Sequence, residues 1–440
     1  MVNVRVTREN LVALPALAPY FILGLLSFAA VPWVLLAAAG RLDAGAYRHP
    51  LVLAAVHLYA LGWGSAVALG ALQQMVAVVY ATVLHSTRLA RAAFVPYALG
   101  LAGLITGFVA LSRAGVARPA LFAAAAGLPL GAMMVLANVT LTLRTAQPTA
   151  RGALIRPFVH ASGVYLLIAF LAGAALAVNL TTGWLLPAWR ATFAAHVGAA
   201  AGGWFLMLVI GISYHLLTFF GFVDKRREFR RPAAVRRLLH AGVVLGIVAA
   251  SLPSLGRGAG TPTGTPLVTG AAGLAVAAAC ALFVGDARGL YARRGPERMH
   301  PAVGHVRAAH AYLALCAVLL AMLACLPAAG FRPAPSWLTA LGFLAAAGWL
   351  SSTILGYLHR ILPFIVWHNR YWGRGREPGV PAFRDMIHQP LAWAAFAVYH
   401  AGVVGTTLAL VTAWPAGPFL ALLGLGAALA AGNLLWTLFR

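Results

Sequence analysis

The chain has 440 residues, of which 62% are hydrophobic and only 9% are charged. Soluble domains carry about 25% charged residues, so this composition excludes a soluble globular enzyme and indicates an integral membrane protein. There are 32 Lys and Arg residues against 8 Asp and Glu residues, which gives a net charge of +24. We expect no nucleic-acid partner, because this charge lies between apolar segments, and the lipid bilayer is the partner that the composition indicates.

Twelve apolar runs are long enough to cross about 30 Å of hydrocarbon as helices. In chain order they cover residues 13–38, 49–81, 93–112, 119–143, 157–179, 190–222, 238–256, 265–285, 302–327, 336–367, 390–413 and 416–438. We therefore predict an all-α integral membrane protein with 12 transmembrane helices, which form a single membrane domain over residues 1–440.

The basic residues are distributed unequally between the two sides of the predicted bundle. The odd-numbered connections hold only seven, namely Arg41, Arg48, Arg113, Arg118, Arg190, Arg257 and Arg332, which leaves 25 of the 32 for the termini, the even-numbered connections and the helix segments beside them. The densest basic segments are 224–237, 292–298 and 369–377. Because Lys and Arg stay on the cytoplasmic side, we predict that both termini are inside and that the protein spans the bacterial inner (cytoplasmic) membrane.

A short motif recurs three times along the chain. The dipeptide Gly-Trp, with a further Gly seven residues after the Trp, occurs as Gly62-Trp63…Gly70, Gly203-Trp204…Gly211 and Gly348-Trp349…Gly356. The copies fall on the second, sixth and tenth predicted helices. Polar pairs follow the second Gly each time, as Gln73-Gln74, Tyr214-His215 and His359-Arg360, and His160 and His305 each precede a Gly-Trp copy by the same interval. We predict three four-helix units, about 1–145, 146–290 and 291–440, related by a pseudo-threefold axis.

This pattern of three four-helix units with histidines on inner helices resembles the catalytic subunit (subunit I) of haem-copper oxidases and nitric oxide reductases. The resemblance implies that the second, sixth and tenth helices line three pores. It also implies that a histidine on the second helix binds the low-spin haem, and that one on the sixth binds the active-site copper. His57 and His196 occupy these places near the outer ends of their helices.

Other parts of the family's pattern are missing. The outer half of the tenth helix reads "SWLTALGFLAAAGWL", without the family's His-x-His pair, and "ASLPSLGRGAGTP" (250–262) lacks its paired histidines. The resemblance therefore implies a divergent member without an intact oxygen-reducing centre.

The histidines near the outer ends allow two interpretations. On an α-helix, His57 shares a strip with Ala60, Gly64, Ala68 and Ala71. Such a strip fits a flat macrocycle, but it fits close helix packing equally well. His196 has a similar strip through Ala200 and Gly203. Both rings are candidate haem or metal ligands, because neutral imidazole binds haem iron and copper.

A second set of polar residues is predicted towards the cytoplasmic ends of the helices or in mid-membrane. It comprises Gln73, Gln74, His160, Tyr214, His215, His305, His310, His359, Arg360 and His400. Polar groups in hydrocarbon need partners, so we expect either an interhelical hydrogen-bond network or a site for a polar or anionic ligand. Among them, His310 and His400 are further candidate cofactor ligands.

Three functions remain open at this stage. The first is a haem- or copper-binding respiratory protein that handles or senses nitric oxide, or has a redox or metal role, with other respiratory subunits or a c-type cytochrome as partners. The second is a quinol-dependent reductase with a rearranged haem site built on His305, His310 and His400. The third is a permease for a small polar or anionic substrate. We favour a protein that is not an enzyme and assign no catalytic residue.

Overall fold

All regular secondary structure in the part of the chain that the computed structural model describes is helical. The described residues are 7–43, 49–147, 149–185, 188–220, 229–255, 265–291, 300–331, 333–375, 377–412 and 414–440, and no strand occurs in them. Within these residues, 12 helices are long and apolar enough to cross a membrane. The predicted all-α membrane fold and the number of spans are confirmed.

The spanning helices lie close to the predicted runs. Nine of them are single α-helices: α1 (Leu14–Ala37), α5 (Thr87–Val109), α6 (Ala114–Thr145), α7 (Ala150–Thr182), α10 (Pro232–Leu255), α11 (Thr265–Tyr291), α12 (Pro301–Cys325), α15 (Gln389–Thr412) and α16 (Gly417–Phe439). Short helices also occur at α2 (Ala39–Asp43), η3 (Leu326–Ala329) and η5 (Phe383–Met386). Several spanning helices continue past the apolar run into Arg-bearing flanks, because backbone hydrogen bonding does not end where the hydrocarbon does.

The remaining three spans, which are the second, sixth and tenth, are composite. Each contains a π-helical segment between two α-helical ones. They are α3–η1–α4 (Pro50–His57, Leu58–Ser65, Ala66–Val79), α8–η2–α9 (Trp189–Gly198, Ala199–Leu206, Met207–Phe219) and α13–η4–α14 (Pro335–Phe343, Leu344–Leu350, Ser351–Tyr371). All three π segments contain the Gly-Trp dipeptide of the repeated motif. Extended π segments are rare, and here they recur at one sequence motif.

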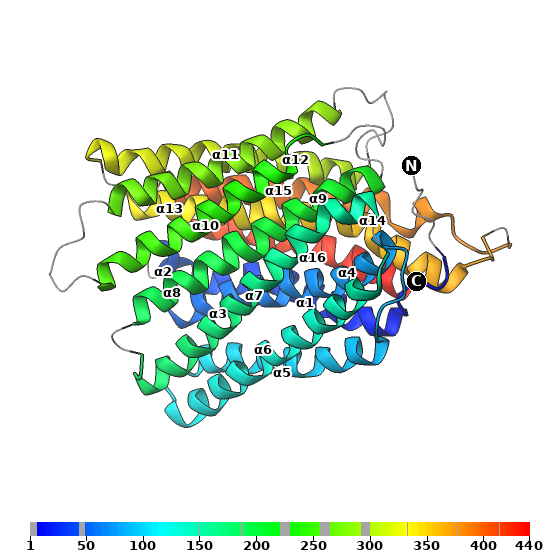
Figure 1. Ribbon diagram of the computed structural model, residues 1–440, viewed down its shortest axis with the longest axis horizontal. Coiled ribbons are helices and arrows are strands. Elements are labelled where there is room, and N and C mark those ends of the chain that lie inside the picture. The colour runs from blue at the N-terminus through cyan, green and yellow to red at the C-terminus, as the bar shows by residue number, and fades with distance from the viewer. Residues whose placement is uncertain are drawn as a thin grey trace. The chain divides into compact units, whose positions relative to one another are not determined.

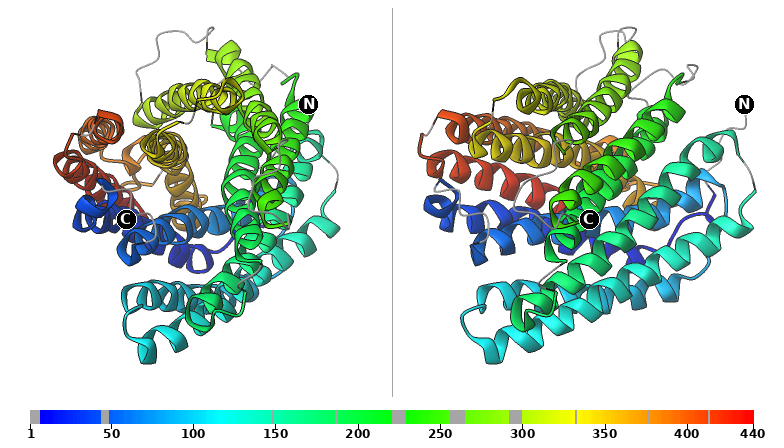
Figure 2. Two further views of the ribbon diagram at one scale, coloured as in Figure 1. Left: turned by 90° about the vertical axis from the view of Figure 1, so that its left-hand side faces the viewer. Right: turned by 60° about the vertical axis from the view of Figure 1, so that its left-hand side comes forward.

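The described helices form two compact units. Unit one comprises Met1–Gly152, Met299–Val306 and Ser351–Arg440, and unit two comprises Ala153–Arg298 and Arg307–Leu350. Figures 1 and 2 show the α5–α6 and α15–α16 pairs of unit one as neighbouring antiparallel helices. The threefold division of the chain stays a prediction.

Glycines bring the helices of these pairs close together. A Cβ atom placed on Gly100 of α5 would lie 2.6 Å from the backbone nitrogen of Leu128 in α6. One placed on Gly402 of α15 would lie 2.5 Å from the backbone nitrogen of Leu423 in α16. Small residues at such positions let helix backbones approach each other closely, and the van der Waals packing that results contributes to helix association in a membrane.

The two glycines of the repeated motif also have recurring contacts. In each copy they face the helix that precedes the composite span, and a Cβ on either glycine would collide with it. The facing residues are Ser27 and Tyr20 for Gly62 and Gly70, Tyr165 and Phe158 for Gly203 and Gly211, and Tyr312 and Val306 for Gly348 and Gly356. The motif therefore has a packing role in all three copies, whatever else it does.

The start of α1 and the end of α16 both contact the end of α14. The Leu14 N–H donates to Oδ1 of Asn369 at 3.1 Å, which joins the start of α1 to the end of α14. Arg370 donates to the carbonyl oxygens of Phe439 and Leu438 at 3.0 and 3.4 Å, which satisfies two carbonyl groups at the end of α16. The start of α1 and the ends of α14 and α16 thus lie at the same end of unit one.

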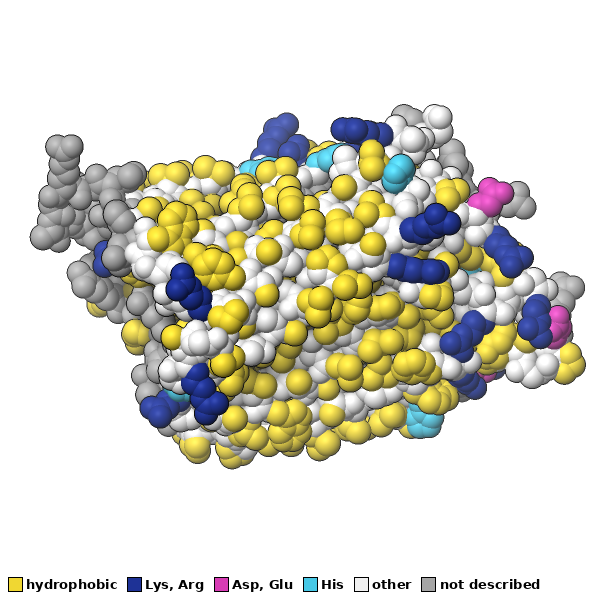
Figure 3. All heavy atoms as spheres, turned by 90° about the horizontal axis from the view of Figure 1, so that it is seen from below, with side chains coloured by type: hydrophobic (Ala, Val, Ile, Leu, Met, Phe, Trp, Pro, Cys, Tyr) yellow, Lys and Arg dark blue, Asp and Glu magenta, His cyan; other side chains and the backbone are white. Residues whose placement is uncertain are grey.

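The surface is apolar, as contact with lipid requires. Hydrophobic side chains cover most of the face in Figure 3, and the Lys and Arg side chains on it lie towards its borders. Leu99 of α5 and Leu171 of α7 are 66% and 60% exposed on helices of membrane-spanning length. Residues 224–228 of the basic segment 224–237 and all of 292–298 lie outside the described residues, and the predicted sidedness stays a prediction.

Candidate functional site

His57 is held by its own helix. It is the last residue of α3, and its Nδ1 lies 2.8 Å from the carbonyl oxygen of Leu53. A carbonyl oxygen can only accept, so Nδ1 carries the proton and the lone pair of the neutral ring is on Nε2. The ring is half-buried and packs beside Phe108, with ring centroids 4.9 Å apart.

His196 is held by a neighbouring helix. Its Nδ1 lies 2.8 Å from the carbonyl oxygen of Ala169 in α7, which again leaves the lone pair of the neutral ring on Nε2. The ring also lies against Gly173, where a Cβ atom would be only 2.8 Å from Cε1 of the imidazole. The carbonyl and the glycine together fix the ring between α7 and α8. His57 belongs to unit one and His196 to unit two.

The small-residue strip beside His57 does not continue as predicted. The 3.6-residue spacing that joined Ala60, Gly64, Ala68 and Ala71 holds for an α-helix, but Leu58–Ser65 is π-helical. A π-helix has more residues per turn, so the positions after it rotate relative to His57. The same applies to Ala200 and Gly203 in η2.

Sequence reasoning missed a hydrogen-bonded contact between the second and tenth spans. Trp63 Nε1 donates to Oγ of Ser351 at 3.1 Å, and the Tyr59 hydroxyl lies 3.1 Å from the same oxygen. Ser351 is fully buried. The repeated motif marks Trp63 in the sequence, but spacing along the chain does not predict that Ser351 is its partner.

The two glutamines of the predicted inner set form a structural network. Asn138 donates from Nδ2 to Oε1 of Gln73 at 3.2 Å, which joins α6 to α4. Gln74 accepts from the Val12 N–H and donates to the Asn10 carbonyl oxygen, both at 3.0 Å. Their amides tie the segment before α1 and the helix α6 to α4.

The members of the inner set in unit two do not form one cluster. The Tyr214 hydroxyl donates to Oδ2 of Asp286 at 3.4 Å, and Arg231 Nε lies 3.9 Å from Oδ1 of the same carboxylate. His215, buried, packs on Phe219. The other two histidines lie elsewhere: His160 is exposed and accepts from Arg156, and His310 is buried against Phe283.

Three histidines of unit one do come together. His305 of α12 lies between His359 of α14 and His400 of α15, with ring centroids 5.5 and 5.2 Å away. His400 Nε2 is 3.3 Å from Nδ1 of His305. Phe396 covers the group, with its ring centroid 5.0 Å from that of His305. The structure thus joins His305 and His400, as the reductase hypothesis expected, but with His359 in place of His310.

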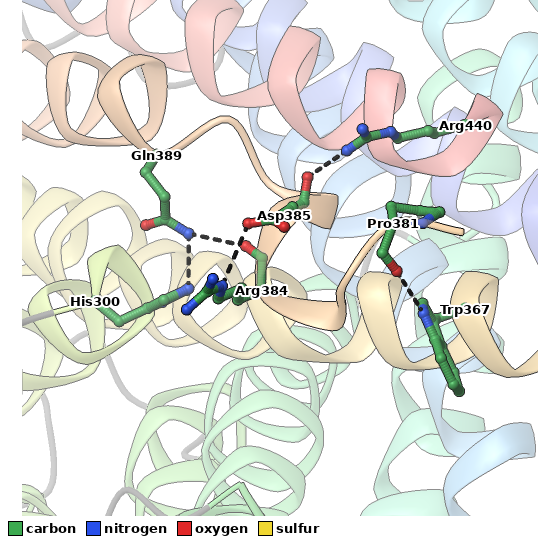
Figure 4. A network of polar contacts seen from close by, with 7 residues as sticks. All are labelled: His300, Trp367, Pro381, Arg384, Asp385, Gln389 and Arg440. Carbon is green, nitrogen blue, oxygen red and sulfur yellow. Dashed lines mark hydrogen bonds and ion pairs between the residues drawn. The ribbon is translucent and has the colours of Figure 1, made fainter. Parts of the chain in front are cut away.

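His300 and Gln389 form a polar contact at the start of α12 and α15, the helices that carry His305 and His400. His300 caps α12 by accepting from the Ala302 N–H at 3.1 Å, and its Nε2 lies 3.1 Å from Nε2 of Gln389 (Figure 4). Burial, with smaller contributions from the charges of Arg360 and His359, lowers the pKa of His300 to about 3. His300 is therefore neutral at pH 7, and its Nδ1 can accept the capping hydrogen bond.

No preformed three-ligand metal centre occurs in the part of the chain that the structure describes. No group of three or more His, Cys, Asp or Glu side chains there has the arrangement needed to hold a metal ion. The described residues therefore do not fit a three-imidazole copper centre. Haem iron needs only one or two imidazoles, so single rings held like those of His57 and His196 fit that requirement.

Comparison with known proteins leaves the family open. No protein-family model matches the chain, and no curated protein is significantly similar to it. The resemblance to haem-copper oxidases therefore stays a hypothesis that rests on the helix number, the repeat and the two histidines.

Proposed function

We propose that this multi-pass membrane protein binds haem, or else copper, at His57 and at His196, as a divergent relative of the haem-copper oxidase subunit without an oxygen-reducing centre. Bound haem iron or copper would supply one-electron transfer or nitric oxide binding. Its place would be the inner membrane of a bacterium, beside other respiratory subunits or a c-type cytochrome.

The observation that carries this proposal is the way in which both rings are held. Metal-ligating histidines usually donate their second ring N–H to a carbonyl or carboxylate, which fixes the tautomer and the direction of the other nitrogen. His57 and His196 do so through Leu53 and Ala169. For His196 the contact crosses between two helices, so it is not merely the contact that a histidine makes within its own helix.

The direct test is cofactor analysis of the purified protein. A Soret absorption band, haem extraction and metal analysis by mass spectrometry should show haem or copper in the wild type. His57→Ala and His196→Ala should lose it while the protein remains folded and monodisperse in detergent. His368→Ala is the matched control, because His368 makes the same contact to a carbonyl four residues earlier, at 2.8 Å, near the end of α14.

The other outcomes separate the rival functions. A wild-type protein with neither haem nor metal contradicts the proposal, and substrate flux in reconstituted vesicles would then favour a permease. Steady-state oxygen or nitric oxide consumption with a quinol would instead assign a reductase.

A further inference from the structure

The imidazole cluster of unit one contains two buried nitrogen atoms without partners. Nε2 of His305 and Nε2 of His359 are both buried and make no hydrogen bond. His305 is 0% exposed and His359 is 2% exposed. Leaving a buried polar atom unsatisfied is costly, because its hydrogen bonds to water are lost without replacement. Two such atoms in one cluster point to a ligand.

The hydrogen bond that Nδ1 of each ring makes indicates the protonation of its Nε2 and therefore the kind of ligand. His359 Nδ1 lies 2.7 Å from the Leu355 carbonyl oxygen, so Nδ1 is the donor and the lone pair of the neutral ring is on Nε2. The Nδ1 atom of His305 lies 3.3 Å from Nε2 of His400. In the tautomer in which His305 donates from Nδ1 to His400, the lone pair of the His305 ring is on its Nε2. In that tautomer both buried Nε2 atoms hold a lone pair, which a metal cation or a hydrogen-bond donor satisfies and an anion does not.

We propose that His305 and His359 bind a copper(I) ion through their Nε2 atoms, with His400 orienting His305 from behind. This site is distinct from His57 and His196, and it does not depend on haem binding there. The three rings come from α12, α14 and α15, all within unit one.

The number and charge of the ligands favour copper(I). Imidazole suits copper, zinc, iron and nickel, but structural zinc takes four protein ligands and no group of three is assembled in the described residues. Copper(I) accepts two-coordinate binding. The described hydrogen bonds of His305 and His359 go to His400 and Leu355 and include no carboxylate, so a monovalent ion leaves the smallest uncompensated charge in the bundle.

The spacing of the two rings is within the range for two imidazoles on one ion. An imidazole nitrogen lies about 2 Å from a bound first-row metal, so two rings on one ion have centroids at most about 6 Å apart. The centroids of His305 and His359 are 5.5 Å apart. Arg360 follows His359 directly, and neighbouring residues on a helix project in different directions, so its charge need not face the ion.

The test uses the full-length protein with Cys280, Cys316 and Cys325 replaced by Ala, since thiolates also bind copper(I). Copper(I) is added under ascorbate in competition with a chromogenic chelator. We expect one equivalent of bound copper, with two nitrogen neighbours in the X-ray absorption spectrum. No bound copper, or a first shell without two nitrogen neighbours, would overturn the proposal without any further substitution.

Variants then locate the site. His305→Gln and His359→Gln should each weaken copper(I) binding at least tenfold, while His359→Met should restore it, because a thioether binds copper(I) but cannot replace an imidazole hydrogen bond. His368→Ala and the double variant His57→Ala/His196→Ala should bind copper(I) like the parent. Unchanged binding in both Gln variants would refute the assignment, and loss only in the double variant would place the metal at the site proposed above.

Discussion

Nε1 of Trp63 donates a hydrogen bond to Oγ of Ser351, which lies 288 positions later in the chain. The Tyr59 hydroxyl shares the same oxygen. A serine hydroxyl has two lone pairs and one proton, so Ser351 can accept from the indole and still exchange a hydrogen bond with the phenol. One small side chain therefore joins the second and tenth spans inside unit one.

Removal of this hydroxyl should destabilise the protein. Ser351→Ala leaves the buried Trp63 N–H without its acceptor, and we expect a loss of about 1–3 kcal/mol in the free energy of unfolding. An SDS titration in mixed micelles measures it. Ser352→Ala is the matched control, because Ser352 is equally buried but its hydroxyl has no partner, so that variant should be neutral or slightly stabilised. Equal losses in both variants would show that the hydrogen bond contributes nothing.

Two glycines of α16 should respond oppositely to the same substitution. A Cβ on Gly426 would overlap the backbone of Tyr399 in α15, so Gly426→Ala should force the helices apart at a cost of about 1–3 kcal/mol. Gly432 has nothing within 4 Å of its Cβ position, so Gly432→Ala should raise stability by about 0.5–1 kcal/mol through helix propensity. Thermal unfolding in detergent measures both, and a Gly426→Ala protein that is as stable as the wild type would contradict the packing argument.

The sequence predicted the spans well and the local helix type not at all. Apolar length alone located all 12 spans, because hydrocarbon thickness sets the length of a helix that crosses it. The segment Leu58–Ser65 reads as ordinary α-helix, since a π segment differs in hydrogen-bond register rather than in composition. The small strip beside His57 assumes α-helical spacing, which the π segment Leu58–Ser65 does not keep.

The inner polar set shows a similar limit. Spacing correctly placed His305, His359 and His400 on three different helices, but depth along a helix does not say which side chains meet. Gln73 and Gln74 were assigned to the same set, yet they bond to Asn138 and to the segment before α1. Which helices are neighbours is decided by packing, and a single sequence does not record it.

His300 should make the protein less stable in mild acid. The pKa of an unfolded histidine is about 6.5, whereas burial holds that of folded His300 at about 3. Between these values the unfolded chain binds a proton that the folded chain does not, so stability falls as the pH is lowered from 6.5 towards 3. The slope from this residue is at most about 1.4 kcal/mol per pH unit, reduced because the ring is partly exposed.

The substitution His300→Asn isolates this contribution. Asn caps a helix without titrating, so the variant should lose less stability than the wild type between pH 6.5 and pH 4. Unfolding midpoints at several pH values provide the comparison. Parallel curves for the two proteins would mean that His300 titrates normally.

The sidedness of the protein can be tested at its C-terminus. The Leu14–Asn369 and Arg370–Phe439 contacts place the start of α1 and the ends of α14 and α16 together, so the side found for one holds for all three. The excess of Lys and Arg in the termini and even-numbered connections predicts that this side is cytoplasmic. Green fluorescent protein fused after Arg440 should fluoresce and alkaline phosphatase at the same point should be inactive, while phosphatase inserted beside Arg113 should be active. An active phosphatase after Arg440 would invert the orientation and place His57 in the cytoplasmic half of the bundle.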